Sequence, residues 1–390
     1  MITVEEALKR VFEIISPIGT EFVQLHNAGG RVLAQPAIAK RDQPPFAAAS
    51  MDGYAIRADD ANSGTVLKII GEAAAGHRHE GKVAPGECVR IFTGAPVPIG
   101  ANKVVIQEDV IRDGDIITLG DSIELKTNIR PKGCDFKIGD LLDAPRILTS
   151  ADVALLAAMN IPNIQVSRRP DVALVSTGDE LVMPGDVPGP DQIIASNTFG
   201  LKTLLDKIGA APRILPIAKD SHESLAAAFE LASCADLIVT IGGASVGDHD
   251  LVGEAASRSG MQRTFYKVAM RPGKPLMAGR MGNAPMLGLP GNPVSAMVCG
   301  HVFLVPAILA MMGLQKSPAQ RKFANLEVDM GIGGPREHYM RAIVRAGKII
   351  PESDQDSSLL SVLANSNALL IRPAGDRQRI KGEIMEYIEI

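Results

Sequence analysis

Apolar residues recur at helical spacing at the start of the chain. Val4, Leu8, Val11 and Ile15 lie three or four positions apart, with polar residues between them. This period places the apolar side chains on one face, so residues 1–15 are predicted to form an amphipathic helix. The segment carries two glutamates and does not have the pattern of a secretion signal.

The next part of the chain is patterned as short strands. From Thr65 to Asp143, apolar runs such as VLKII, CVRIF and KVVIQ alternate with turn residues, and Asp113-Gly114 suits a tight hairpin. We therefore expect an all-β region here. Residues 149–159, TSADVALLAAM, then begin with a helix cap and predict a helix that returns the chain toward its first helix. The β region is interpreted as an insertion.

From Arg169 onward, apolar strands alternate with helices. DVALVST, RILPIA and ADLIVTIGG have the composition of strands, and NTFGLKTLLDKIG and SHESLAAAFELA that of helices. This order predicts a doubly wound, mostly parallel α/β domain. After Leu314, the segments FANLEVDM, HYMRAIVRA, ALLIRP and IMEYIEI are separated by turns and predict a C-terminal β domain.

One segment is apolar enough to be weighed as a membrane span. Residues 281–315 contain no Asp, Glu, Lys or Arg, and residues 294–314 are largely apolar. However, Pro306, His301 and many small residues favour a helix buried in a large α/β core. We therefore expect a buried helix and no membrane contact.

Composition and charge narrow the class of ligand. The chain has 390 residues, of which 46% are hydrophobic, so it can bury more than one core. Its net charge of −4 gives no general attraction for nucleic acid, so local groups must hold any anionic ligand. The four cysteines form no CxxC or Cys/His cluster, which favours a reducing, cytoplasmic compartment over a zinc site or disulfide framework.

Glycine-rich loops follow the strands of the expected α/β domain, at the edge where such sheets bind ligands. Glycine lets backbone N–H groups approach an anion, and a following helix N-terminus adds a favourable dipole. One glycine pair would be explained by strand termination alone, whereas two loops on one edge favour a phosphate ligand. The predicted binding residues in these loops are Thr177, Gly178, Gly242, Gly243, Ser245, Gly247, Gly291, Asn292, Pro293 and Ser295.

Acidic and basic residues accompany these loops. The acids would repel one another alone, but with Mg²⁺ they become oxygen ligands of a metal that also bridges phosphate oxygens. For any single acid, a solvated loop position is an equally good explanation. The bases would supply positive charge for an oxyanion or a phosphate. The acids are Glu180, Asp220, Asp248 and Asp250, and the bases are Lys267, Arg271 and Lys274.

Two other motifs suggest different chemistry. Residues 243–247, GASVG, match the GxSxG nucleophile elbow of serine hydrolases, with His301 or His338 as candidate bases. The motif continues into the polar sequence DHD instead of a helix, which argues against a hydrolase but leaves it as an alternative. His77 and His79 form an HxH pair without a third ligand, so a solvated loop is favoured there.

Six motifs, in order, resemble those of the molybdopterin molybdenumtransferases, to which the C-terminal domain of gephyrin is related. The resemblance covers essentially the whole chain. It implies an elongated homodimer whose active cleft lies between the α/β domain of one subunit and the β domain of the other. The motifs are SMDGYA at 50–55, FTGAPVP at 92–98, STGDEL at 176–181, GGASVGDHD at 242–250, RPGKP at 271–275 and GLPGNPVSA at 288–296.

The resemblance also implies a reaction and its residues. Molybdenum from molybdate is inserted into adenylylated molybdopterin, and AMP is released with the help of Mg²⁺; molybdopterin adenylyltransferase and recipient molybdoenzymes would be partners. A non-catalytic molybdopterin-binding or scaffold protein is the second interpretation. The residues implied as functional are Asp52, Thr93, Asp135, Glu180, Asp220, Asp250, Lys267 and Arg271, with looser matches at Arg130 and Ser361.

This sequence departs from the family pattern at two positions. Arg271 stands where some members carry lysine, and it keeps the charge with two donors for an oxyanion. Leu251 stands where the family often carries tyrosine, so the resemblance does not extend to a stacking contact at this position.

The pattern and the resemblance together divide the chain into four domains. They are a helical or linker domain of residues 1–20, 40–50 and 144–168; an inserted β domain of residues 21–39 and 51–143; an α/β domain of residues 169–316; and a C-terminal β domain of residues 317–390.

Overall fold

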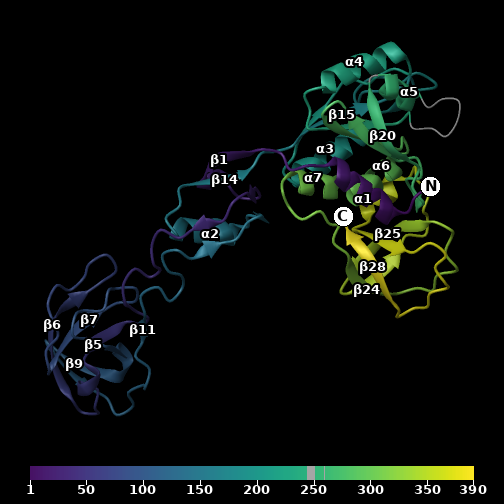
Figure 1. Cartoon of the computed structure of the whole chain (residues 1–390). Helices are drawn as coiled ribbons and strands as arrows, with labels where there is room; N and C mark the ends of the chain where they lie inside the picture. The colour runs from purple at the N-terminus through teal and green to yellow at the C-terminus, as the bar shows by residue number, and fades with distance from the viewer. Residues whose placement is uncertain (244–250, 259) are drawn as a thin grey trace.

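The chain folds into three separate bodies that are arranged in a line (Figure 1). The computed structural model describes residues 1–243, 251–258 and 260–390. The α/β domain and the C-terminal β domain lie together at one end, a small middle domain follows, and the inserted β domain forms the far end. The chain therefore passes twice through the middle domain, on its way out to the inserted domain and on its way back.

The α/β domain is built on a six-stranded sheet in the order β18-β15-β19-β23-β22-β20. The first four strands are parallel, while β22 and β20 continue the sheet through antiparallel pairings, which confirms a mostly parallel sheet. The strands are β15 (Asp171–Ser176), β18 (Ala211–Ile214), β19 (Leu237–Ile241), β20 (Met261–Tyr266), β22 (Met277–Met281) and β23 (Ala284–Leu289).

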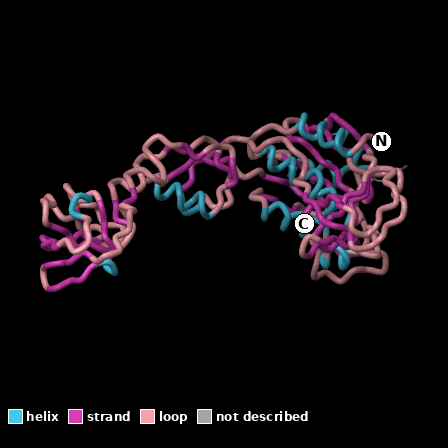
Figure 2. The backbone as a smooth tube through the Cα atoms, turned by 90° about the horizontal axis from the view of Figure 1, so that it is seen from below, coloured by secondary structure: helices cyan, strands magenta, loops and turns pink. Residues whose placement is uncertain are grey.

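Helices cover both faces of this sheet (Figure 2). Val172 and Leu174 of β15 face one apolar core, and their neighbours Ala173 and Val175 face the other, because successive strand side chains alternate. The sheet is therefore doubly wound, as predicted. The first core includes α3 (Asn197–Lys207), and the second includes α4 (His222–Ala232) and α5 (Leu251–Arg258).

The long apolar helix lies in the first core. It consists of α6 (Pro293–Cys299), a π-helical turn (Gly300–Leu304) and α7 (Val305–Met311). The stretch from Pro293 to Met311 is long and apolar enough to span a membrane, but 78% of its most apolar window is buried, as expected for a core helix. In the π turn the Val305 amide donates to the Gly300 carbonyl, and the wider turn accommodates Pro306, which has no amide to donate.

The first helix, α1 (Val4–Ile14), packs on the α/β domain. Thr3 caps it by accepting a hydrogen bond from the Glu6 amide, and its buried face joins the core beside α7, β20 and β22. The sequence-based division had placed residues 1–20 in the helical domain. The structure instead packs this helix on the α/β domain. Periodicity shows that a helix has an apolar face to bury, but it does not show which domain buries that face.

The middle domain is formed by strands from both passes of the chain. Its sheet has the order β1-β14-β2-β13, and α2 packs beside it with Leu156 and Met159 in the core. Residues 21–39, which were assigned to the inserted domain, belong to the middle domain. Strands β1 and β2 pair within this sheet and β3 pairs with β12 in a separate two-stranded sheet, all with partners more than 100 residues away in sequence. The elements are β1 (Thr20–Gln24), β2 (Val32–Leu33), β3 (Ala37–Ile38), β12 (Leu141–Leu142), β13 (Arg146–Ile147), α2 (Ser150–Ala158) and β14 (Asn163–Ser167).

The inserted β domain contains a six-stranded sheet in the order β8-β5-β7-β6-β10-β9, with an apolar cluster on each face. Strands β9 and β10 form the hairpin predicted at Asp113-Gly114. The strands are β5 (Gly53–Ile56), β6 (Val66–Ala73), β7 (Glu87–Ile91), β8 (Lys103–Ile106), β9 (Val110–Asp113) and β10 (Ile116–Leu119), and the short pair β4 (Ala48–Ala49) and β11 (Ile129–Arg130) joins this domain to the middle one.

The C-terminal domain is a closed barrel, because pairing runs from β25 through β26, β24, β28 and β27 back to β25. Strand β21 (Met270–Arg271), from the α/β domain, adds to it by pairing with β25. The barrel elements are β24 (Lys322–Leu326), β25 (Glu337–Arg345), β26 (Lys348–Pro351), α8 (Leu360–Asn365), β27 (Ala368–Arg372) and β28 (Ile384–Glu389).

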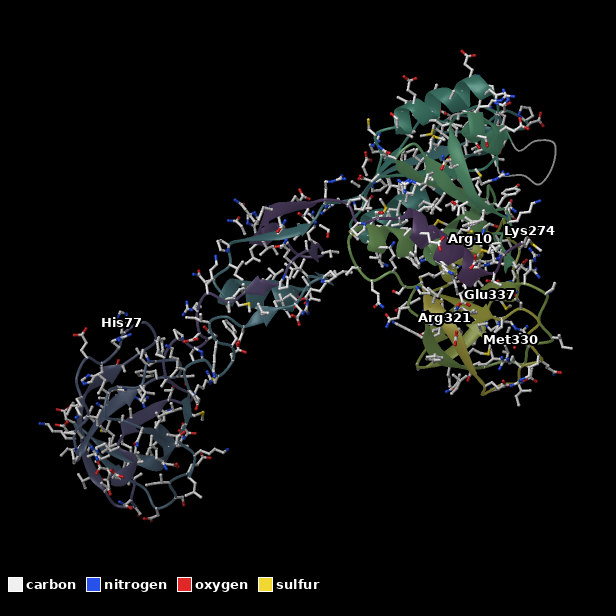
Figure 3. All side chains as sticks on the ribbon, viewed as in Figure 1. Arg10, His77, Lys274, Arg321, Met330 and Glu337 are labelled. Carbon is white, nitrogen blue, oxygen red and sulfur yellow. The ribbon has the colours of Figure 1, made fainter. Side chains whose placement is uncertain are left out.

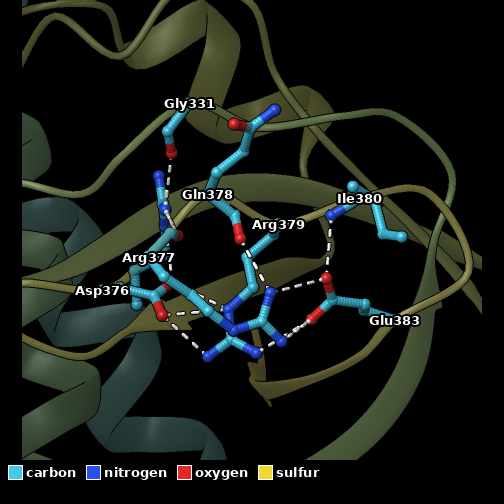
Figure 4. Close-up of polar contacts among 8 residues, drawn as sticks. Gly331, Asp376, Arg377, Gln378, Arg379, Ile380 and Glu383 are labelled. Atoms are coloured by element: carbon cyan, nitrogen blue, oxygen red, sulfur yellow. Dashed lines mark hydrogen bonds and ion pairs between the residues drawn. The ribbon is translucent and has the colours of Figure 1, made fainter.

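An ionic network ties the loops at one end of this barrel (Figure 4). Asp376 accepts from Arg372 Nε at 3.0 Å and from Arg379 Nη2 at 2.7 Å, and Arg379 also reaches Glu383 at 3.0 Å. Hydrogen bonds from Arg377 and from the Ile380 amide help lower the pKa of Glu383 to about 2. The network keeps these charges paired and holds the loop between β27 and β28.

Candidate functional site

A cleft of about 570 Å³ opens at the carboxyl ends of β15, β19 and β23. This is the edge where open α/β sheets bind ligands. The predicted residues that line it are Thr177, Glu180, Gly242, Gly243, Gly291, Asn292, Pro293 and Ser295. Ser245 and Gly247 lie outside the described residues, as do Asp248 and Asp250.

Glycines let the loops around the cleft approach each other closely. Gly242 has a φ of +97°, and a Cβ there would lie 2.6 Å from the Thr177 carbonyl oxygen. Gly243 has a φ of +63°, and a Cβ there would lie 2.9 Å from Thr177 Oγ1 and collide with Val252. A Cβ on Gly178 would collide with the Glu180 carboxylate. Gly242 and Gly243 therefore require glycine for both conformation and space, whereas Gly178 requires it for its φ of +147°.

Polar groups in the cleft are arranged to receive an anion. The hydroxyl of Thr177 is buried, and no described residue hydrogen-bonds to it. The long helix that starts at Pro293 and helix α3 both begin at the cleft, and Asn197 of α3 links them by donating to the Gly291 carbonyl at 2.7 Å. Two helix N-termini and an unpartnered hydroxyl are suited to phosphate oxygens. Sequence reasoning missed Ser196 and Asn197, although they follow strand β17 (Ile193–Ile194) directly.

The predicted acids are distributed unevenly. Glu180 lines the cleft, whereas Asp220 lies on the neighbouring exposed loop, where its amide donates to Asp179 Oδ1 at 3.2 Å. Within residues 1–243, 251–258 and 260–390, no group of three or more His, Cys, Asp or Glu side chains could hold a metal ion. The magnesium site therefore stays a prediction, with two of its three acids described.

The predicted bases belong to the same edge. Strand β20 runs parallel to β23, since both are antiparallel to β22, so Lys267 follows a carboxyl end of the sheet. Its φ of +71° is uncommon for a residue with a side chain, and strain of this kind is frequent at functional sites. Arg271 lies on β21, and Lys274 precedes Pro275 of the cleft wall, where the α/β and C-terminal domains meet (Figure 3).

The structure adds a buried arginine from the C-terminal barrel. Arg341, on β25, is 0% exposed; its Nη2 donates to the carbonyls of Asp354 and Asp356 at 3.2 and 2.9 Å. Its Nε and Nη1 are buried and have no partner among the described residues. Burial, with the nearby charge of Arg271, lowers the pKa of Arg341. Sequence reasoning missed Arg341, although a basic residue within the apolar strand HYMRAIV was the available signal.

The loop that Arg341 supports closes one wall of the cleft. Asp356 Oδ1 accepts from the amide and hydroxyl of Ser358, which lines the cleft, at 2.8 and 2.6 Å. Asn292 donates to Ser357 Oγ at 3.0 Å across the domain boundary. Ser361 lies on α8 just beyond this loop and is exposed. The cleft is thus shared by the α/β domain and the C-terminal barrel.

The remaining implied residues lie elsewhere in this chain. Asp52 and Thr93 are in the inserted β domain, at the opposite end of the molecule from the cleft (Figure 1). Asp52 Oδ1 accepts hydrogen bonds from the Thr93 hydroxyl and from the Thr93 amide, both at 2.7 Å. These bonds lower the pKa of Asp52, and the bond from the hydroxyl has the larger effect. Asp135 and Arg130 are exposed between the middle and inserted domains. One chain does not bring these residues to the cleft.

The hydrolase alternative gains no support from its candidate bases. Burial lowers the pKa of both His301 and His338 to about 4, and they lie on the π turn and on β25. Ser245, the candidate nucleophile, lies outside the described residues. His79 packs its ring between Gly71 and Gly81 on the inserted domain, where Figure 3 also places His77.

Three family models cover most of the chain. Residues 2–160 match the MoeA N-terminal region (domain I and II), residues 173–310 a probable molybdopterin binding domain, and residues 324–390 the MoeA C-terminal region (domain IV). The second match contains the sheet edge that forms the cleft. The fold and the site therefore define a multidomain protein built around a domain of the molybdopterin-binding class.

Similar proteins extend this match over nearly the full length. A molybdopterin molybdenumtransferase of Nostoc sp. is 33% identical, covering 96% of this chain and 91% of its own length, and one of Haemophilus influenzae is 34% identical, covering 95% and 94%. The crystal structure of a molybdopterin biosynthesis MoeA protein from Pyrococcus horikoshii OT3 superposes with a TM-score of 0.88 at 28% identity over the full length of both chains. The chain belongs to the molybdopterin molybdenumtransferase family, as the six motifs indicated.

Proposed function

We propose that this chain is an enzyme that inserts molybdenum from molybdate into adenylylated molybdopterin and releases AMP. The observation that carries the proposal is a glycine-lined phosphate cradle at the sheet edge, together with Lys267, Arg271 and Lys274 in the segment that leads from strand β20 to Pro275 of the cleft wall. Family membership supplies the chemical identity of the two anions. The cleft accounts for how one site can hold both of them.

The phosphates of the adenylylated pterin bind against the glycine loops and the two helix N-termini. Gly242 and Gly243 allow close approach, and the Thr177 hydroxyl, which has no partner among the described residues, can donate to a phosphate oxygen. Glu180 and Asp220 fit a Mg²⁺ ion, which commonly takes only one or two carboxylates together with substrate phosphates; Asp250 would join them. Bound there, the ion would neutralise developing charge on the phosphates.

Molybdate binds where the basic residues meet. Arg341 Nε and Nη1 are buried donors without an acceptor among the described residues, and a buried donor of this kind is costly unless a ligand satisfies it. Arg271, Lys274 and Lys267 add charge from the α/β side. Binding both anions in one site brings the oxyanion close to the dithiolene. Removing water from both anions strengthens the electrostatic interactions that hold them.

The site is completed by a second copy of the chain. In this proposal Asp52 and Thr93 of one subunit reach the cleft of its partner in a cytoplasmic homodimer. The separation of these residues within one chain supports the arrangement. Molybdopterin adenylyltransferase would supply the adenylylated substrate, and molybdoenzymes would receive the product.

The test is incubation of the protein with adenylylated molybdopterin, Mg²⁺ and molybdate, with AMP and pterin-bound molybdenum as readouts. Molybdate-dependent AMP release is expected, and Asp220→Ala or Asp250→Ala should abolish it while the fold stays intact. AMP release that ignores molybdate would contradict the proposal. Binding without turnover would favour a scaffold, and labelling of Ser245 by a fluorophosphonate would favour a hydrolase.

A further inference from the structure

One arginine of the inserted β domain is held between aromatic rings. Arg90, on β7, has its guanidinium carbon 5.1 Å from the ring centroid of Tyr54 and 4.6 Å from that of Phe92. A flat guanidinium stacks on aromatic faces in a way that a lysine ammonium does not reproduce. The two rings therefore fix the plane in which Arg90 donates its hydrogen bonds.

Those hydrogen bonds hold the backbone around Asp52. Arg90 Nη1 donates to the carbonyl of Gly53 at 3.0 Å, and Nη2 donates to Gln107 Oε1 at 2.7 Å. The backbone N–H of Gln107 in turn donates to the backbone carbonyl of Asp52 at 3.1 Å. Arg90 thus acts on Asp52 by two routes, through the following residue and through Gln107.

The same arginine contacts the segment that carries Thr93. Phe92, one of the two stacked rings, directly precedes Thr93, whose amide and hydroxyl both donate to Asp52 Oδ1. Gly53 fixes the other side, because a Cβ there would collide with the Val105 carbonyl. One guanidinium therefore sets the relative positions of the two family motifs on this domain.

We propose that Arg90, together with Gln107, is a positioning residue that holds Asp52 and Thr93 in the geometry that the reaction requires. This inference rests on the proposed role of Asp52 in the partner's cleft and deepens it. Arg90 itself need not touch substrate. A displacement of reacting groups by about 1 Å can cost up to about a hundredfold in rate, so the stacking has a measurable kinetic consequence.

A double-mutant cycle of Arg90→Met and Asp52→Ala tests the inference. Arg90→Met should lower kcat by about tenfold, through misplacement of Asp52, with KM for molybdate unchanged. In the Asp52→Ala background it should cause no further loss, because there is no carboxylate left to position. Equal losses in both backgrounds would overturn the inference. Full activity of Asp52→Ala would instead overturn the proposed role of Asp52.

Amide hydrogen exchange of residues 91–94 gives a readout that does not depend on activity. Exchange at Thr93 should accelerate in Arg90→Met and stay unchanged in the control Arg112→Met, since Arg112 of the same sheet donates to the nearby Gly114 carbonyl and not, among the described residues, to the Asp52 segment. Arg90→Lys should not restore the slow exchange. If Arg90→Met does not fold, Gln107→Leu removes one of the two acceptors of Arg90, together with the hydrogen bond from Gln107 Nε2 to Glu108, and should change exchange at Thr93 in the same direction. Unchanged exchange at Thr93 contradicts the proposal.

Discussion

The cleft and the Asp52 region of the inserted domain are built on opposite principles. At the cleft, function depends on burial: Thr177 in its wall and Arg341 in the adjoining barrel keep polar atoms without partners among the described residues, and Gly242 and Gly243 leave no room for a side chain. In the inserted domain, Asp52 and Thr93 lie at the surface and are hydrogen-bonded to each other, and Arg90 donates a hydrogen bond to the backbone carbonyl of the neighbouring Gly53. One region is open to a ligand, and the other is complete by itself.

This contrast teaches how each region should respond to change. Unpartnered buried groups are costly until a ligand arrives, so the cleft should gain most from binding. The satisfied surface pair should instead contribute only when presented to another molecule. Substitutions in the cleft should therefore change activity through ligand binding, whereas those around Asp52 should change activity through the groups presented to the partner.

The largest effect is expected from mixing two impaired variants. Asp52→Ala and Glu180→Ala should each keep only a small residual activity, and their mixture should recover about a quarter of the wild-type activity, because half of the dimers are mixed and each mixed twofold dimer contains one intact cross-subunit site. AMP release after coexpression measures this. Pairing Asp52→Ala with a variant that lacks both side chains should recover nothing. Failure of the first mixture to recover activity would place both residues in one subunit's site.

Replacing the buried arginine should have the next largest effect. Arg341→Met should lower kcat/KM for molybdate by about a hundredfold, as is typical when one preorganised donor to an anion is lost. Stability should change little, because an apolar side chain of similar length replaces a guanidinium with unsatisfied nitrogens. Arg345→Met, at the exposed end of the same strand, is the control. An unchanged kcat/KM for molybdate in Arg341→Met would show that Arg341 is not part of the oxyanion site.

A pair of glycine substitutions compares the two regions directly. Gly242 and Gly94 both have positive φ, at +97° and +83°, but only Gly242 lies against backbone. Gly94→Ala should cost about 1 kcal/mol from conformation alone, whereas Gly242→Ala should cost about 3 kcal/mol or more, since the Thr177 carbonyl must also move. Calorimetric unfolding measures both. Equal losses would mean that the cleft loop relaxes freely.

Acid should produce the smallest effect, and the ionic network of the C-terminal barrel is where it can be tested. The pKa of Glu383 is lowered from 4.5 to about 2, so its contribution to stability is complete above pH 4.5 and is lost as the pH falls toward 2. Glu383→Gln should flatten the decline in barrel stability over that range. Glu80→Gln, an exposed position in the inserted domain, should leave the decline unchanged. A decline that persists in Glu383→Gln would assign it to other carboxylates.

Local sequence patterns were sufficient for the sheet, the hairpin at Asp113-Gly114, the buried helix and the glycine loops. Each depends on the period or chemistry of adjacent residues. The placement of α1 and of residues 21–39 was not predictable in this way, because both depend on partners distant in sequence. A pattern identifies a face to be buried without identifying what buries it.

The same limit applies to the candidate site. Thr177, Glu180 and the glycines follow strands of one sheet, so topology alone brought them together. Arg341 and Ser358 come from another domain, and only the contact between the barrel and the cleft shows their relevance. Asp52 and Thr93 were recognised through family motifs, and the bond between them is visible only in three dimensions.

The π turn at Gly300–Leu304 has a consequence for how this protein tolerates insertions and deletions. A π turn holds one residue more than the α-helical turn it replaces, so removing one residue between Gly300 and Leu304 would restore a regular helix. Pro306 would then oppose the carbonyl four positions before it. The helix would still start correctly at the cleft, but α7 would turn its buried face away from α1. The extra residue thus lets one end of the helix serve the ligand and the other serve the core.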